Sequence, residues 1–165
     1  MTPLRYTPLF LLLVLAGCSG YSLGEGGASV LAPEYRTISI DEVNNPTTLS
    51  WLEPEVRKLL RDELNNRGTI TWTDDKARAD ALISININRY HRATAVAGES
   101  EETLRSVAVF EFEAVIRSTR SGGVLWRSGR MSQDWPFFTG DGAKADAEVT
   151  RLGIRRLADR MTQNY

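Results

Sequence analysis

Few side chains in this chain could carry out covalent or metal chemistry. It contains one histidine, His91, and one cysteine, Cys18, among 165 residues. No serine lies in the strand–turn–helix pattern of a nucleophile elbow. Because His91 is the single histidine, a Ser–His–Asp triad would have to use it as the base. A lone histidine beside arginines is more typical of a surface residue than of a metal ligand. We therefore expect a protein that is not an enzyme and has no metal or cofactor.

The segment before Cys18 has the features of a secretory signal. Arg5 is followed by an apolar run at residues 9–16, and Ala16 and Gly17 are small residues directly before Cys18. A basic start, a short apolar core and small residues at a cleavage point are typical of a signal peptide. The run has about eight residues, whereas a membrane-spanning helix needs roughly 20. We therefore expect residues 1–17 to form a signal peptide.

Residues 15–18, Leu-Ala-Gly-Cys, resemble the lipobox of bacterial lipoproteins. The resemblance implies that Cys18 is diacylated, with palmitate among the acyl chains, and that the chain is cut before it and acylated on the new amino group. Several acyl chains anchor a protein stably, where a single one is marginal. Ser19, in place of aspartate, resembles the sorting pattern for the outer membrane. The alternative is an ordinary signal peptide with an incidental cysteine.

Charge and length indicate one small domain behind a tether. The 20 basic and 21 acidic residues give a net charge of −1, so no basic domain points to nucleic acid. Glycine and serine dominate residues 18–30, which we expect to hold the lipidated cysteine and a flexible tether. Residues 31–165 have the length of a single domain.

The first half of this domain alternates between extended and helical patterns. Residues 36–40 predict a short strand. A helix follows, with Pro54 in its first turn and Gly68 at its end. Its apolar stripe is Leu52, Val56, Leu59, Leu60 and Leu64. Residues 69–72 predict a short extended piece, and residues 80–91 predict a strand with Ile83, Ile85 and Ile87 on one face.

The second half predicts a hairpin and a closing helix. Residues 94–102 form a polar loop, residues 104–117 a strand, and residues 119–123 a turn. We expect residues 124–135 to return as one strand. A helix over residues 143–161 should bury the stripe Val149, Leu152, Leu157 and Met161. The expected fold is an α+β two-layer sandwich, with two helices packed on one face of a mixed sheet of about four strands.

This string of elements resembles the LptE family, the lipopolysaccharide-assembly lipoproteins of the Gram-negative outer membrane. The resemblance covers nearly the whole chain, and its specificity comes from the order of the parts together with the lipobox. The matching parts are residues 16–18, 20–23, Pro33, 36–40, 54–68, 79–82, 107–116, 123–126 and 135–138.

The resemblance implies binding rather than covalent chemistry. Members of the family plug a large outer-membrane β-barrel, LptD, help it to assemble, and contact lipopolysaccharide. The expected partners are therefore an LptD-like barrel, lipopolysaccharide, and the outer membrane through the lipid on Cys18. The expected location is the periplasmic face of the outer membrane.

Four basic residues are candidates for contact with the phosphates of lipopolysaccharide. Arg89, Arg92 and Arg105 fall near the ends of the predicted hairpin, and Lys144 starts the last helix. Arginine can pair a phosphate bidentately. The alternative is that these are solvated charges at strand ends.

The aromatic residues after the hairpin have two interpretations. Trp126, Trp135, Phe137 and Phe138 are either core at the end of the sheet or anchors in the barrel lumen. Phe137 and Phe138 are the better candidates for barrel contact because they flank a turn.

Two other functions stay open at this point. The first is another outer-membrane lipoprotein, acting as an accessory or activator of a cell-envelope complex. The second is a lipid-modifying enzyme, which would need a pocket that holds His91 and a carboxylate together.

Overall fold

The computed structural model describes residues 29–96, 105–138 and 140–162 of the chain. The signal peptide, Cys18 and the predicted tether up to residue 28 lie outside the described residues. The elements, in order, are η2 (Pro33–Tyr35), β1 (Thr37–Asn44), α2 (Leu52–Arg67), β2 (Thr71–Trp72), η3 (Lys76–Arg78), β3 (Ala81–Val96), β4 (Arg105–Ser118), β5 (Val124–Arg127), β6 (Met131–Phe138) and α3 (Gly142–Thr162).

Helix α2 forms as its apolar periodicity predicts. Leu52, Val56, Leu60 and Leu64 are buried along one face, while Leu59 is only partly buried beside them. Gly68 ends the helix with a φ of 66°, and its N–H donates to the carbonyl of Leu64 at 3.2 Å. A left-handed residue at this point suits glycine, which has no Cβ to clash.

The sheet is mixed and is built around β3. Strands β2, β1, β3, β4 and β5 lie in that order, and β6 also pairs with β4. β1 is parallel to both β2 and β3, which α2 permits by crossing over between β1 and β2. β4 is antiparallel to β3, β5 and β6. The predicted α+β class with two helices and a mixed sheet is therefore confirmed for the described residues.

The predicted count of about four strands is wrong. The described residues form six strands, because residues 124–135 do not return as one strand and the short extended piece pairs with β1 as β2. β5 and β6 are separated at Ser128, Gly129 and Arg130, where Gly129 has a φ of 66°. The Oγ of Ser128 accepts the N–H of Ala114 at 2.9 Å and donates to the carbonyl of Gly129 at 2.6 Å. This side chain thus replaces a backbone hydrogen bond between strands at the point where the chain leaves the sheet.

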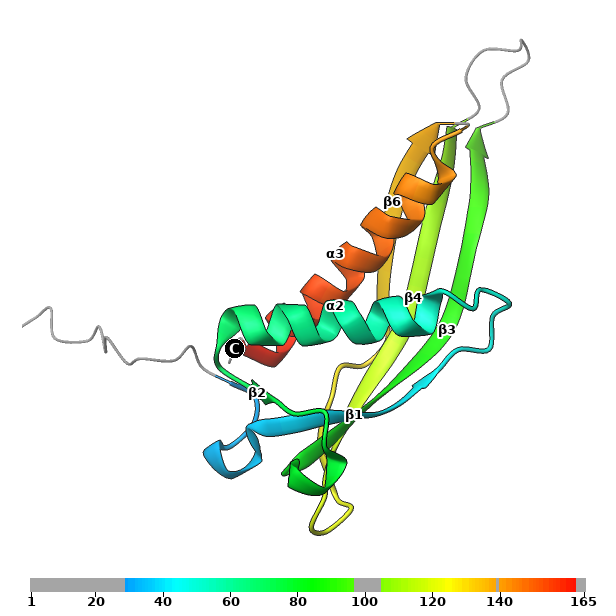
Figure 1. Cartoon of the computed structure of the whole chain (residues 1–165). Helices are drawn as coiled ribbons and strands as arrows, with labels where there is room; N and C mark the ends of the chain where they lie inside the picture. The colour runs from blue at the N-terminus through cyan, green and yellow to red at the C-terminus, as the bar shows by residue number, and fades with distance from the viewer. Residues whose placement is uncertain (1–28, 97–104, 139, 163–165) are drawn as a thin grey trace, which may run out of the picture.

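The two helices cross each other over the curled sheet, so a plain two-layer sandwich is too simple a description (Figure 1). α2 contacts β1 and β2, whereas α3 contacts β4 and β6, and the two helices contact each other. One core cluster lies between them and the sheet, with Phe110 and Phe112 stacked at 4.4 Å between ring centroids. Within the described residues, neither helix is both long enough and apolar enough to cross a bilayer.

Helix α3 packs with a stripe slightly different from the predicted one. Val149, Leu157 and Met161 are buried as expected, but Ile154 is buried and Leu152 is only partly so. Gly153 faces the rings of Phe110 and Phe112, where a Cβ would lie 2.8 Å from Phe110 Cδ1. This glycine therefore lets α3 approach the sheet closely.

Candidate functional site

Most of the predicted site residues lie at one end of the molecule. β1 pairs with β3 only as far as Asn86, so beyond that point β3, β4 and β6 continue as a three-stranded extension. α3 starts at the same end, because it follows β6 after a short turn (Figure 1). The extension and the start of α3 together carry Arg89, Arg92, Arg105, Phe138 and Lys144. We call this region the distal end.

A β-bulge decides which basic residue of β3 faces the helices. The register with β4 shifts between Ile87 and Arg89, so Tyr90 and Arg92 are paired with Phe110 and Ala108, which are buried under the helices. Arg89 and His91 consequently project from the opposite face. The structure therefore separates Arg89 from Arg92 across the sheet.

Arg92 is held by Asp146 of α3. Its Nε donates to Oδ1 at 3.1 Å and its Nη2 donates to Oδ2, which makes a bidentate pair. Asp146 is 7% exposed, whereas the Arg92 side chain is 49% exposed. The hydrogen bond to Asp146 raises the pKa of the Arg92 guanidinium above its ordinary value. Part of the guanidinium thus stays open to solvent while the rest is fixed in place.

Tyr90 and Gly142 support this ion pair. The Tyr90 hydroxyl donates to the backbone carbonyl of Asp146 at 3.3 Å, and burial, as the largest cause, raises its pKa well above 10.0. A Cβ at Gly142 would lie 2.9 Å from Nη1 of Arg92. The start of α3 therefore leaves room for the guanidinium. No sequence pattern indicated Tyr90, Gly142 and Asp146, because their relation to Arg92 depends on how α3 docks.

Two shallow hollows flank the ion pair. One has a volume of about 430 Å³ and is lined by Trp51, Glu55, Ala143, Asp146 and Ala147. The other, of about 340 Å³, is lined by Thr47, Thr48, Leu49, Tyr90, His91, Arg92 and Asp146. The ring of Trp51 meets Tyr90 edge-on at 5.7 Å and is 36% exposed. Lys144, on the first turn of α3, is exposed and is not among the residues that line these two hollows.

The other predicted residues lie apart from Arg92. Arg89 donates to Glu111 at 2.6 Å on the face away from the helices. Arg105 is the first residue of β4 and is in register with Phe138. Phe138 is 51% exposed, whereas Phe137 is partly buried against the core. Because adjacent residues of a strand point to opposite faces, the two phenylalanines lie on different sides of the sheet.

The two tryptophans that precede Phe137 also pack against the core. Trp126 and Trp135 are both partly buried against the core cluster, as are Leu125 and Phe137. Of the candidates for barrel contact, Phe138 is the side chain that remains well exposed.

The hollow beside Arg92 also bears on the enzymatic alternative. His91 and Asp146 both line it, but the side chain of His91 projects from the face of β3 opposite the one that meets Asp146. The carboxylate of Asp146 is engaged by Arg92, however, and no hydrogen bond joins it to His91 in the described part of the chain. Across residues 29–96, 105–138 and 140–162, no group of three or more His, Cys, Asp or Glu side chains could hold a metal ion.

Comparison with protein families gives a match to the model of LptE, lipopolysaccharide-assembly, over residues 35–164. The chain belongs to the LptE family. The family that its sequence resembled is therefore confirmed, and membership assigns this LptE-family protein to lipopolysaccharide assembly. A comparison with curated proteins gave no match.

Solved structures share the fold of this LptE-family chain. The PelC dodecamer from Paraburkholderia phytofirmans is 14% identical with a TM-score of 0.54, and the alignment covers 85% of this chain and 96% of that one. The solution NMR structure of uncharacterized lipoprotein B from Nitrosomonas europaea is 10% identical with a TM-score of 0.56, covering 86% and 91%. At these identities the likeness extends to the fold alone.

Proposed function

We propose that this LptE-family protein is a lipid-anchored, non-enzymatic lipoprotein that binds an LptD-like β-barrel and assists lipopolysaccharide transport to the outer-membrane surface. The family match over residues 35–164 carries this proposal. The lipobox residues before Cys18 support an anchor at the periplasmic face of the outer membrane. The long extension of β3, β4 and β6 gives the domain a narrow distal end that suits insertion into a barrel (Figure 1).

Co-purification tests the barrel partner. The full-length chain with a carboxy-terminal tag would be extracted from membranes in mild detergent, and its partners identified by mass spectrometry. We expect a large β-barrel of the LptD type in near-equal amount. Recovery of a different envelope complex without the barrel would contradict the proposal and favour an accessory lipoprotein.

We also propose that Arg92 and Lys144 contact the phosphates of lipopolysaccharide, with Arg89 and Arg105 at the same end in lesser roles. Arg92 supports this because its side chain is about half exposed while its guanidinium is fixed by Asp146. A fixed, partly open guanidinium loses little conformational freedom on binding a phosphate. Lys144 contributes a second positive charge on the first turn of α3, the helix that also holds Asp146.

Charge reversal at Lys144 tests this contact without disturbing the Arg92–Asp146 pair. We expect Lys144→Glu to weaken binding of lipopolysaccharide to the full-length protein by about tenfold, since a phosphate would meet a like charge. Arg155→Glu is the matched control, because Arg155 is an exposed basic residue farther along the same helix. Equal affinities for Lys144→Glu and the unaltered protein would remove Lys144 from the contact.

Arg92→Lys separates charge from geometry. Lysine keeps the positive charge but cannot pair Asp146 and a phosphate with a planar fork of donors. We expect weaker binding of lipopolysaccharide with unchanged net charge. Undiminished binding would mean that Arg92 serves only the ion pair with Asp146.

A further inference from the structure

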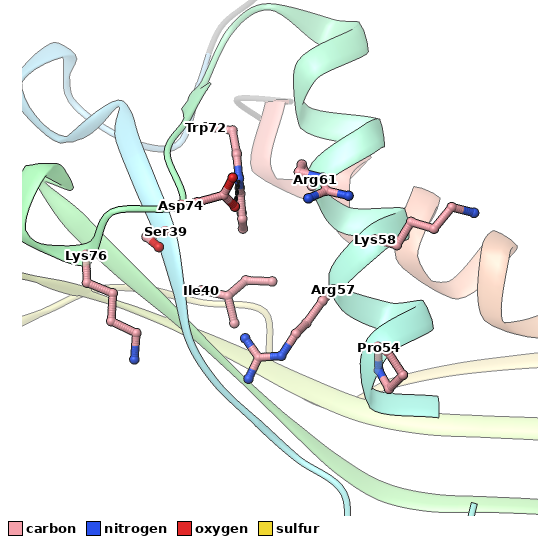
Figure 2. A pocket seen from close by; sticks show the side chains of 9 residues that line it. All are labelled: Ser39, Ile40, Pro54, Arg57, Lys58, Arg61, Trp72, Asp74 and Lys76. Carbon is pink, nitrogen blue, oxygen red and sulfur yellow. Dashed lines mark hydrogen bonds between the residues drawn. The ribbon is translucent and has the colours of Figure 1, made fainter. Parts of the chain in front are cut away.

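A separate hollow lies between α2 and the β1–β2 edge of the sheet (Figure 2). Its volume is about 380 Å³, within the usual range for small-molecule sites. It is lined by Ser39, Ile40, Pro54, Arg57, Lys58, Arg61, Trp72, Asp74 and Lys76. These residues belong to β1, α2, β2 and the η3 segment, so none is shared with the distal end.

Two arginines line this hollow with donors to spare, and Lys76 of η3 lines it as well. Lys76 is already engaged, because its Nζ donates to the carbonyl and the carboxylate of Asp41 at 2.8 and 2.9 Å. Arg57 and Arg61 lie one turn apart on α2, and Arg57 uses Nε and Nη2 to donate to one oxygen of Glu53, at 3.1 and 3.0 Å. Within the described residues Nη1 of Arg57 makes no hydrogen bond, and the Arg61 guanidinium has a long ion pair, with Nε 3.9 Å from Oδ1 of Asp62. Surface ion pairs of this kind are weak, so an anion can compete for these groups.

The opposite wall combines an aromatic ring with a carboxylate. Trp72 is half-buried on β2, and its Nε1 donates to Oδ1 of Asp74 at 2.9 Å. Ile40 lies between the tryptophan and Arg57, which reaches beneath it (Figure 2). Lys58 extends away from the other labelled side chains in the same view. The hollow thus has an aromatic wall, an apolar middle and a cationic side.

This set of groups matches one ligand chemistry. The flat tryptophan face suits the apolar face of a sugar ring, and the Asp74 carboxylate can accept hydrogen bonds from sugar hydroxyls. Arg57 and Arg61 supply charge-assisted donors for a phosphate. A bare phosphate would leave Trp72 unused, and a neutral sugar would leave the two arginines unused.

We propose that this hollow binds a phosphorylated sugar, either a free sugar phosphate or the phosphorylated sugar headgroup of a glycolipid. Arg57 and Arg61 hold the phosphate, Trp72 stacks on the ring, and Asp74 binds hydroxyls. Binding here requires neither the barrel partner nor Arg92 and Lys144. Absence of binding at this site would therefore leave the proposed function untouched. Absence of the barrel partner would likewise leave this site untouched.

Titration of the full-length protein in detergent micelles tests the site. Glucosamine 1-phosphate is the probe, compared with glucosamine and with inorganic phosphate, and binding is followed by ligand-observed NMR. We expect glucosamine 1-phosphate to bind about tenfold more tightly than either fragment, because only it engages both walls. Equal affinity for inorganic phosphate, or no binding of the sugar phosphate, would overturn the assignment.

Variants locate the binding within the chain. Arg57→Ala and Trp72→Phe should each weaken the binding of glucosamine 1-phosphate by about tenfold or less. Phenylalanine is chosen because it keeps most of the packing of Trp72. Arg151→Ala is the matched control, because Arg151 also pairs with a carboxylate on its own helix, Glu148 at 2.6 Å. If Arg151→Ala weakens binding as much as Arg57→Ala, the interaction is general surface charge and the site is refuted.

Competition identifies the source of the ligand. Lipopolysaccharide that displaces glucosamine 1-phosphate from Lys144→Glu protein supports a glycolipid headgroup, because the distal contact is weakened in that variant. Retention of glucosamine 1-phosphate against lipopolysaccharide supports a free sugar phosphate in the same hollow.

Discussion

At the scale of single residues, Gly153 decides how closely α3 approaches the sheet. A methyl group there would lie 2.8 Å from Phe110, whose ring is fully buried and stacked on Phe112. Alanine improves helix propensity by about 1 kcal/mol, but overpacking a core costs about 1–3 kcal/mol. The overpacking should win, because the aromatic pair has no free space to move into.

We therefore predict that Gly153→Ala lowers the free energy of unfolding by about 1 kcal/mol. Urea denaturation of the variant and the unaltered protein measures the difference. Ala147→Gly, at an exposed position of the same helix, gives the size of the propensity effect alone. Higher stability of Gly153→Ala would show that the contact with Phe110 is loose.

Tyr90 gives the distal end a dependence on alkaline pH. Burial raises the pKa of its hydroxyl well above 10.0, so the unfolded chain loses this proton first as pH rises. The raised pKa of Tyr90 therefore adds to the free energy of unfolding. This addition is fully present below pH 10.0 and is lost as pH rises towards the pKa of the folded state. Tyr90→Phe removes the titrating group, so above pH 10.0 the free energy of unfolding of the variant should fall less steeply than that of the unaltered protein. Parallel stability profiles from urea denaturation across this range would contradict the prediction.

At the scale of elements, the break between β5 and β6 depends on one buried side chain. Ser128 is 6% exposed, and its Oγ satisfies the N–H of Ala114 in the middle of β4. Gly129 then takes a left-handed conformation that restarts the chain as β6. Two short strands can therefore pair with the single long strand β4.

Ser128→Ala should lower the free energy of unfolding by about 1–3 kcal/mol, because a buried backbone N–H would lose its partner. Thermal and urea denaturation would both report the loss. Ser132→Ala is the control at an exposed serine of β6 and should change stability by less than about 0.5 kcal/mol. A near-neutral effect of Ser128→Ala would mean that Ala114 finds another acceptor.

At the scale of the whole molecule, the proposed anchor and the fold are separable. The described contacts begin at Ser29, and the N–H of Val30 donates to the carbonyl of Met161 at 3.0 Å near the end of α3.

We predict that Cys18→Ala leaves the thermal unfolding of the domain unchanged but releases it from membranes of cells that lack the barrel partner, because a bound barrel would retain the domain without the lipid. Circular dichroism and membrane fractionation measure the two properties on the same preparation. Membrane association that persists after mild detergent-free washing of the variant would argue against lipidation at Cys18. A lower melting temperature would instead show that residues near Cys18 contribute to the fold.

Local sequence patterns were sufficient for the helices and for the long strands. The stripe of α2 and the glycine after it depend on neighbours within one or two turns, so periodicity finds them. Alternation along β3 likewise identified its buried face up to Ile87. The order of these elements, together with the lipobox, was enough to indicate the LptE family.

Tertiary structure alone decided which site residues meet. The bulge after Ile87 adds a residue without a sequence signal, so Arg92 rather than Arg89 lies on the face that the helices cover. Arg92 finds Asp146 only because α3 docks against β4 and β6, 54 residues along the chain. Strand breaks, bulges and ion pairs between distant segments depend on packing partners that local patterns do not contain. The sequence by itself therefore determined the family and most elements, while docking determined the surfaces that those elements present.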